Sequence, residues 1–156
     1  MQNQIIQKIG KPVKENALPK LQSTYPNARV KGRVITTKPV GVSFENRQDV
    51  IARMQMGDRV WLDREPENPY DPNAIAVCRS NGEMVGFISR DLAACIAPYF
   101  DAYSYPIKGR VTALTGSQWD GYTLGLVINF KLPKPKRTND NGHKTSFNDW
   151  DDDWEF

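Results

Sequence analysis

Apolar and polar residues alternate in several short stretches between residues 29 and 130, and glycine, proline or asparagine interrupts the chain between most of them. An alternation with a period of two is the pattern of a β-strand with one buried face. It predicts strands at residues 29–35, 40–44, 58–63, 74–79, 84–88, 105–115 and 122–130. Asn81-Gly82 lies between two of these stretches and is typical of a tight type I′ hairpin turn.

Two stretches instead repeat their apolar residues with the period of a helix. The first begins at Asn46, a favourable N-cap residue, and extends to Gly57. The second runs from Ser89 to about residue 100, and Pro98 limits its length. The residues expected to face inward are Val50, Ile51, Met54, Leu92, Cys95, Ile96 and Tyr99. About six short sequential strands and two short helices predict a mainly β fold, a small closed or half-closed barrel.

The two ends of the chain lack such a pattern. Residues 1–28 contain three prolines and no sustained period, so we predict a flexible or loosely docked arm there. The barrel is expected over residues 29–132. From there the stretch KLPKPKR (131–137) is basic and rich in proline, which predicts an extended linker. The polar and acidic remainder cannot build a core, so residues 133–156 are predicted to form a linker and tail.

The net charge of +3 conceals a division along the chain. Residues 139–156 contain six acidic residues and one lysine, a net charge of −5, so the other 138 residues carry +8. A basic body with an acidic appendage indicates a polyanionic partner and a segment that modulates it. The plainer interpretation is that the lysines and arginines only make the body soluble.

Several kinds of catalytic site are excluded by residue content. The only histidine, His143, lies in the predicted tail, so no His-dependent nucleophile can be assembled on the body. Cys78 and Cys95 lack zinc-ligand spacing and are interpreted as small buried hydrophobic residues of a reducing compartment. We expect no cofactor, no metal and no enzymatic activity. A magnesium-dependent nuclease is a weaker alternative, because four carboxylates cluster near one loop: Asp63, Glu65, Glu67 and Asp71.

No apolar stretch reaches the roughly 18 residues that a membrane span requires, and the first ten residues do not resemble a secretion signal. The sequence therefore predicts a cytoplasmic protein without membrane contact.

The stretch REPENPYDPNAIAV (64–77) is longer than a hairpin connection requires and contains three prolines. With KPVGVSFENRQ (38–48) and GEMVGFISRDLA (82–93), it resembles the HIRAN domain family. The centre of the resemblance is N-P-Y-D-x-N-A-I-x-V followed by G-x-x-x-G-F-I, and it extends from about residue 30 to 132. The resemblance implies a barrel similar to the oligonucleotide-binding (OB) fold, and a grip on the 3′ end of single-stranded DNA.

The resemblance also implies roles for individual residues. Tyr70 would stack on the terminal base, Asp71 would accept a hydrogen bond from the 3′ hydroxyl, and Asn68 would position the sugar-phosphate. Phe44 would offer a second aromatic surface and Arg90 would meet a phosphate. The chain departs from DNA-binding members at two positions, where Ser43 replaces an arginine and Phe87 replaces a histidine; each change removes a polar contact.

Elementary physics agrees with this assignment for the loop. One aromatic ring contributes about 1–3 kcal/mol of stacking whatever the base. A carboxylate such as Asp71 suits a free hydroxyl and repels a phosphate, since like charges about 4 Å apart cost roughly 4 kcal/mol at an effective dielectric constant of 20. The structural alternatives are that Tyr70 covers the core, that Asp71 only caps its own turn, and that Phe44 fills the barrel. Phe87 is expected to be half-buried.

The sequence thus predicts a module that binds single-stranded DNA at its 3′ end, in DNA repair, replication or defence. The alternative is an adaptor that recruits a repair or replication protein through this loop and the tail. The segment SFNDWDDDWEF (146–156) is loosely similar to the acidic tip of bacterial single-stranded-DNA-binding proteins. We expect it either to occupy the DNA site until displaced or to hook a partner protein. A basic stripe formed by Arg90, Lys108 and Arg110 would favour DNA.

Overall fold

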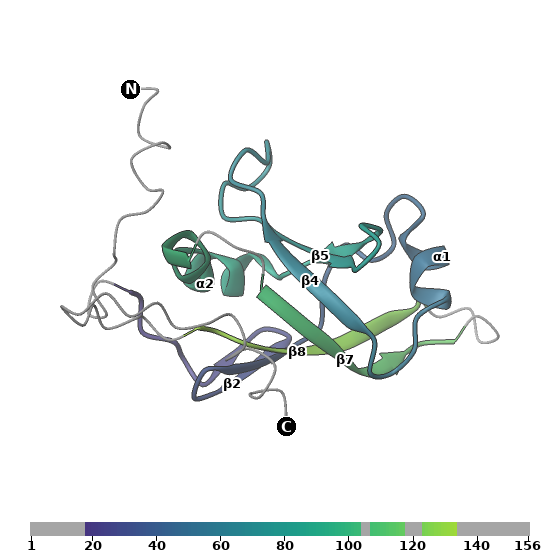
Figure 1. The fold of residues 1–156 in the computed structure, drawn as a ribbon, viewed down its shortest axis with the longest axis horizontal. Helices are drawn as coiled ribbons and strands as arrows, with labels where there is room; N and C mark the ends of the chain where they lie inside the picture. Colours follow the sequence, from purple (N-terminus) through teal and green to yellow (C-terminus); the bar gives the residue numbers. More distant parts are fainter. Residues whose placement is uncertain (1–17, 104–106, 118–122, 134–156) are drawn as a thin grey trace, which may run out of the picture.

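The computed structural model describes residues 18–103, 107–117 and 123–133, and these residues form one sheet flanked by two helices (Figure 1). Its eight strands are antiparallel and lie in the order β1-β2-β3-β8-β7-β4-β5-β6. They are β1 (Thr24–Tyr25), β2 (Ala28–Lys31), β3 (Val34–Thr37), β4 (Arg59–Arg64), β5 (Ile75–Arg79), β6 (Met84–Phe87), β7 (Ile107–Thr115) and β8 (Gly125–Lys131). The mainly β class is confirmed, with eight strands rather than about six.

The first part of the sheet differs from the prediction. Residues 29–35 are not one strand, because a turn at Gly32 (φ 63°) folds β2 back onto β3. The sheet also begins at Thr24, within the predicted arm, because Pro26 and Asn27 (φ 63°) turn the chain between β1 and β2. Residues 40–44 form a loop in which only Val40 pairs with the sheet, at Phe87. Alternation therefore located the apolar residues correctly but missed two reversals of the chain.

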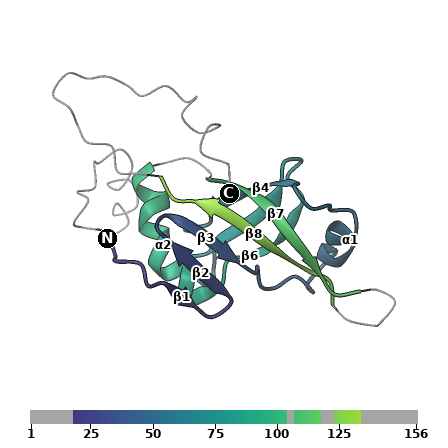
Figure 2. The same ribbon diagram turned by 90° about the horizontal axis from the view of Figure 1, so that it is seen from below.

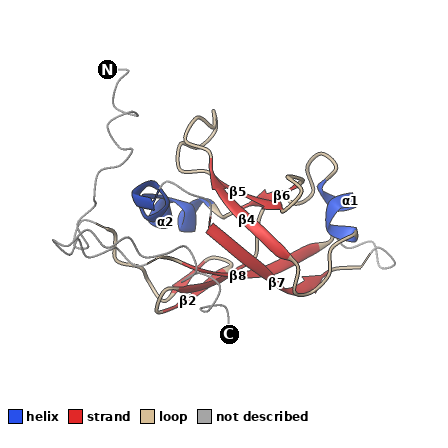
Figure 3. Cartoon of the chain, in the orientation of Figure 1, coloured by secondary structure: helices blue, strands red, loops and turns tan. Residues whose placement is uncertain are grey.

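Two helices lie at opposite ends of the sheet (Figure 3). Helix α1 (Arg47–Ala52) is shorter than predicted, and the Asn46 side chain makes no capping hydrogen bond. Helix α2 (Arg90–Tyr103) extends beyond the predicted end and contains Pro98. The backbone carbonyl of Ser89 accepts from Ala93, whereas its buried hydroxyl has no partner among the described residues.

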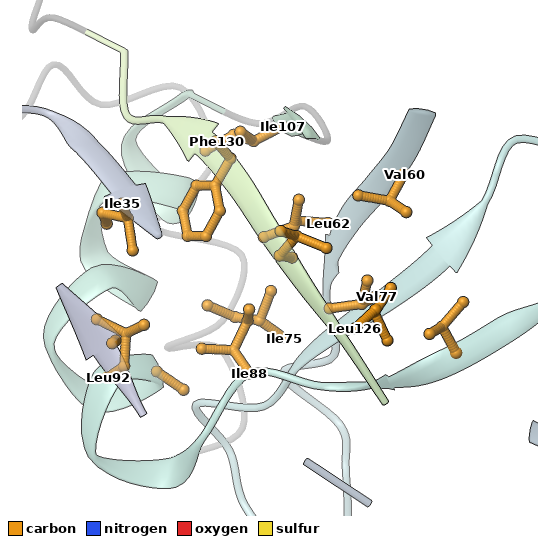
Figure 4. Packing of buried hydrophobic residues seen from close by; sticks show 14 of the residues in the cluster. Ile35, Val60, Leu62, Ile75, Val77, Ile88, Leu92, Ile107, Leu126 and Phe130 are labelled. Carbon is orange, nitrogen blue, oxygen red and sulfur yellow. The ribbon is translucent and has the colours of Figure 1, made fainter. Parts of the chain in front are cut away.

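The core lies between the concave side of the sheet and α2. Ile35, Leu62, Leu92 and Phe130 come from four different elements and are fully buried there (Figure 4). Along β7 and β8, buried residues alternate with partly exposed ones, as expected for strands with one buried face. The concave face is therefore occupied by the core, and only the loops and the convex face remain for binding.

The barrel is only partly closed. Its two edge strands, β1 and β6, are not paired with each other, and the isolated bridge between Val40 and Phe87 links β6 to the chain that leaves β3. Gly86 permits this contact, because a Cβ atom there would lie 2.6 Å from the Val40 carbonyl oxygen. The segment after residue 40 is thus held against β6.

The cysteines are free thiols and are half-buried rather than fully buried. Burial raises the pKa of the Cys78 thiol, and the nearby Asp63 and Glu65 carboxylates raise it further. Among the described residues, no helix has the length and apolar character needed to cross a membrane.

Candidate nucleic-acid interface

The loop of residues 65–74 leaves the end of β4, returns into β5, and is fixed at its base by Arg64. The Arg64 Nη1 donates to the carbonyl oxygens of Pro72 (2.8 Å) and Ala74 (3.1 Å). Its Nε donates to Asp101 of α2 at 2.9 Å, and the Arg64 side chain is only 15% exposed. One planar guanidinium thus binds both the far side of the loop and the helix behind it, which fits the fork geometry of arginine.

The tip of the loop is organised by Asn68. Its Oδ1 accepts from the backbone amides of Tyr70 (2.9 Å) and Asp71 (3.2 Å), and its Nδ2 donates to Glu65 at 3.1 Å. This is an Asx-type turn, in which a side chain satisfies backbone donors. The contacts leave one N–H of Asn68 for a ligand, so its main contribution here is to the shape of the loop.

Asp71 uses one carboxylate oxygen within its own turn. Its Oδ1 accepts from the backbone amide of Asn73 at 2.9 Å, as expected for a capping residue. Its Oδ2 lies 4.0 Å from Arg90 Nε and makes no hydrogen bond within the described residues. The capping role and a ligand-binding role are therefore compatible, because each uses a different oxygen.

Arg90 stands beside this carboxylate at the start of α2. Its side chain is 78% exposed, and its Nη2 donates weakly to the Tyr70 carbonyl oxygen at 3.4 Å. Most of its five N–H donors face water and are available to a phosphate. Tyr70, Asp71 and Arg90, which the sequence separates by up to twenty residues, are thus brought together.

Tyr70 and Phe44 are the most exposed aromatic residues of the described chain, at 87% and 64%. Neither of them fills the core, so the packing alternatives for both are wrong. Their loops rise on the same side of the molecule, on either side of β5 and β6 (Figure 1). Ser43 is exposed next to Phe44, and Phe87 is half-buried on β6 between the two loops.

The Phe44 loop is fixed by two residues for which the sequence predicted only helix formation. Arg47 is buried, donates to the Gly41 carbonyl oxygen at 2.7 Å, and lies over the Phe87 ring, 5.3 Å from its centroid. Gln48 donates to the carbonyl oxygens of Val42 and Leu124 at 2.8 and 2.9 Å. The adjacent pair Arg47-Gln48, three and four residues after Phe44, was the available signal, but spacing alone does not reveal such contacts.

The acidic residues near the loop do not form a metal site. Within the described residues, no group of three or more His, Cys, Asp or Glu side chains could hold a metal ion. Burial raises the pKa of Asp63, and the adjacent Glu65 raises it further. A surface hollow of about 380 Å³ beside them is lined by residues 64–69 and contains no aromatic ring. It is therefore not a place where a base can stack.

Three predicted features lie wholly or partly outside the described residues: the N-terminal arm over residues 1–17, the linker from residue 134 onward, and the acidic tail. The site itself consists of a braced loop with an exposed tyrosine, a carboxylate and an arginine, and a second fixed loop with an exposed phenylalanine. These are the elements of a binding surface at one end of a small OB-like barrel.

Comparison with known proteins identifies the family of this chain. The HIRAN domain model matches residues 33–133, and the chain belongs to this family. Over 96 residues, the chain is 35% identical to the Fanconi-associated nuclease 1 homolog of Arabidopsis thaliana. The aligned region covers 62% of this chain and 10% of that protein. The crystal structure of the HIRAN domain of human HLTF is 29% identical, with a TM-score of 0.47, over 62% of this chain and 74% of that one. The HLTF HIRAN domain in its DNA-bound conformation is 24% identical, with a TM-score of 0.41, over 68% and 78% of the two chains.

Proposed function

We propose that this chain is a non-enzymatic module that binds single-stranded DNA and prefers a free 3′ hydroxyl, acting in DNA repair, replication or defence. The observation that carries the proposal is the arrangement at residues 70, 71 and 90. An aromatic ring that is 87% exposed stands beside a carboxylate with one uncommitted oxygen and an arginine that is 78% exposed. Membership of a family with a DNA-bound member supports the choice of ligand.

Each group has a distinct task in this proposal. The Tyr70 ring stacks on the terminal base, an interaction that tolerates any sequence. Asp71 Oδ2 accepts a hydrogen bond from the terminal 3′ hydroxyl, and Arg90 binds the phosphate that precedes it. Because Asn68 and Arg64 already hold the loop, little ordering cost remains to oppose binding. Phe44 supplies a second ring for a neighbouring base.

The chemistry at the end of the strand tests this proposal. A 3′-phosphorylated oligonucleotide is expected to bind about tenfold more weakly than its 3′-hydroxyl twin, since a phosphate would meet the Asp71 carboxylate. The effect is smaller than unscreened repulsion implies, because Arg90, 4.0 Å from that carboxylate, offsets part of it. Fluorescence polarisation with labelled oligonucleotides, blocked or free at either end, measures the difference.

Two variants serve as controls for that measurement. Asp71→Ala should remove the difference between free and blocked ends, whereas Arg90→Ala should weaken both and reduce the salt dependence by roughly one counterion. A 5′ phosphate should change little. Equal affinity for the 3′-hydroxyl, 3′-phosphate and 5′-phosphate oligonucleotides would exclude end recognition. If the protein bound none of the three, the protein-interaction adaptor would be favoured instead.

The acidic tail provides a separate prediction. If residues 139–156, with their net charge of −5, compete for the DNA site, their removal should tighten DNA binding severalfold. The gain should be greatest at low ionic strength, where exposed charges are least screened. Titrations of the full and truncated chains at several salt concentrations provide the test. Unchanged affinity throughout would leave the tail as a hook for a partner protein.

A further inference from the structure

The convex face of the sheet carries a row of polar and basic side chains that the loop site does not use. The strand register places Arg29 of β2 opposite Thr36 of β3, and Thr36 opposite Asn129 of β8. Asn129 lies opposite Arg110 of β7, which lies opposite Arg59 of β4. Their inward-facing neighbours along each strand are more buried, so this row lies on the outer side.

Further basic residues lie one step along the same strands and on the same face. They are Lys31, Lys131 and Lys108, two residues from Arg29, Asn129 and Arg110 respectively. The Lys108 ammonium lies 5.2 Å from the centroid of the Trp61 ring, so an aromatic surface is set among the cations. In Figure 2 the strands β2, β3, β8 and β7 lie in front of α2, with neither helix covering them.

Three arginines of this row have no acidic partner among the described residues: Arg29, Arg59 and Arg110. Other described arginines, outside this row, do lie within 4.0 Å of a carboxylate. They are Arg47, Arg53, Arg64, Arg79 and Arg90. Arg59 and Arg110 are directly opposite each other, and like charges at such a cross-strand pair are destabilising. The fold thus keeps a repulsive pair that a bound anion would relieve.

We propose that this convex basic face is a second nucleic-acid contact, which binds backbone phosphates of the strand beyond the end held by the loop. The inference rests on the proposed function, because it assumes a single-stranded nucleic acid. Across five strands the row is about 19 Å wide, since neighbouring strands are about 4.8 Å apart. A run of cations beside the half-buried indole of Trp61 suits a strand of phosphates and bases.

The position of the face sets the length of strand that reaches it. Trp61 lies three residues before Arg64, at which β4 ends and the loop begins, or about 10 Å along the strand. Asp63 lies between them on the same face, so one carboxylate interrupts the positive charge between the loop site and the basic face. A single strand stacked with the duplex spacing of about 3.4 Å per nucleotide would need roughly nine nucleotides to span the gap and the row, and an extended strand would need fewer.

Oligonucleotides of two lengths test this proposal. For the full chain, the double variant Arg59→Gln/Arg110→Gln should bind a 20-nucleotide strand roughly tenfold more weakly, with a smaller salt slope, since two phosphate contacts are lost. A strand of four nucleotides should bind the double variant and the unaltered protein with the same affinity. The variant should keep its preference for a free 3′ hydroxyl, and Arg59→Gln alone should not lower the melting temperature, because it removes a repulsion.

The matched control is Arg53→Gln/Arg79→Gln, which removes the same charge from two residues that pair with Glu83 instead. This control should affect both lengths little. Equal weakening of the short and long strands, or no weakening, would overturn the proposal. The proposal would also be overturned if Arg59→Gln/Arg110→Gln kept full affinity for DNA but bound an acidic peptide of residues 139–156 more weakly. A length-dependent loss without any end preference would retain the basic face and exclude the end recognition proposed for the loop.

Discussion

Replacing Tyr70 with alanine is expected to weaken binding of a single-stranded oligonucleotide by roughly 5- to 150-fold, which corresponds to the loss of about 1–3 kcal/mol of stacking. The ring is 87% exposed and fills no part of the core. Its removal should therefore leave the free energy of unfolding within about 0.5 kcal/mol of the original value. Fluorescence polarisation and chemical denaturation measure the two quantities independently.

The Tyr70→Phe variant is the matched control, because it keeps the ring and removes only the hydroxyl. It should bind nearly as well as the unaltered protein. Phe44→Ala should cause a smaller loss, since Phe44 is less exposed and its loop lies on the other side of β5 and β6 (Figure 1). If Tyr70→Ala unfolds the protein, or binds with unchanged affinity, the ring is not a stacking platform.

The sequence predicted local structure best where the residues that determine it lie within one short segment. The β5–β6 hairpin was predicted from Asn81-Gly82 and the alternation on both sides of it, and both strands are present. Its turn is not the predicted type I′, because that turn needs a positive φ angle at both central residues and only Gly82 (φ 90°) has one. The Gly82 amide instead donates to the Arg79 carbonyl oxygen at 2.9 Å, which closes a turn over residues 79–82. The loop motif indicated the family directly. The turn at Gly32 was missed because the apolar alternation of residues 29–35 continues through it. The turn at Asn27 was missed because residues 1–28 show no sustained period that would indicate a strand on either side.

Features that depend on distant residues were not accessible in the same way. The prediction grouped Arg90, Lys108 and Arg110 in one stripe, but Arg90 lies beside the loop while the other two lie on the convex face. Strand register determines which residues share that face, and the pairing of β4 with β7 joins residues almost fifty positions apart. Likewise, nothing in the spacing of Arg64 and Asp101 indicates that they form an ion pair.

That ion pair leads to the second large effect. Arg64→Ala is expected to lower the free energy of unfolding by about 2–3 kcal/mol, because it removes charged hydrogen bonds to Asp101, Pro72 and Ala74. It should also abolish the preference for a free 3′ hydroxyl, since the return segment of the loop that contains Asp71 loses its anchor. Urea denaturation and binding of free and blocked oligonucleotides measure the two effects.

Two further variants separate charge from geometry in this anchor. Asp101→Ala removes the helix contact but leaves the Arg64 bonds to Pro72 and Ala74, so it should cost stability while keeping the end preference. Arg64→Lys retains the positive charge without the planar fork and cannot reach all of these acceptors, so it should restore the end preference only in part. Should Arg64→Ala keep full discrimination between free and blocked ends, the three prolines and Asn68 would suffice to hold the loop. Arg64→Ala would then lower only the free energy of unfolding. Residues 65–74 would hold the binding loop in order without the Arg64 side chain.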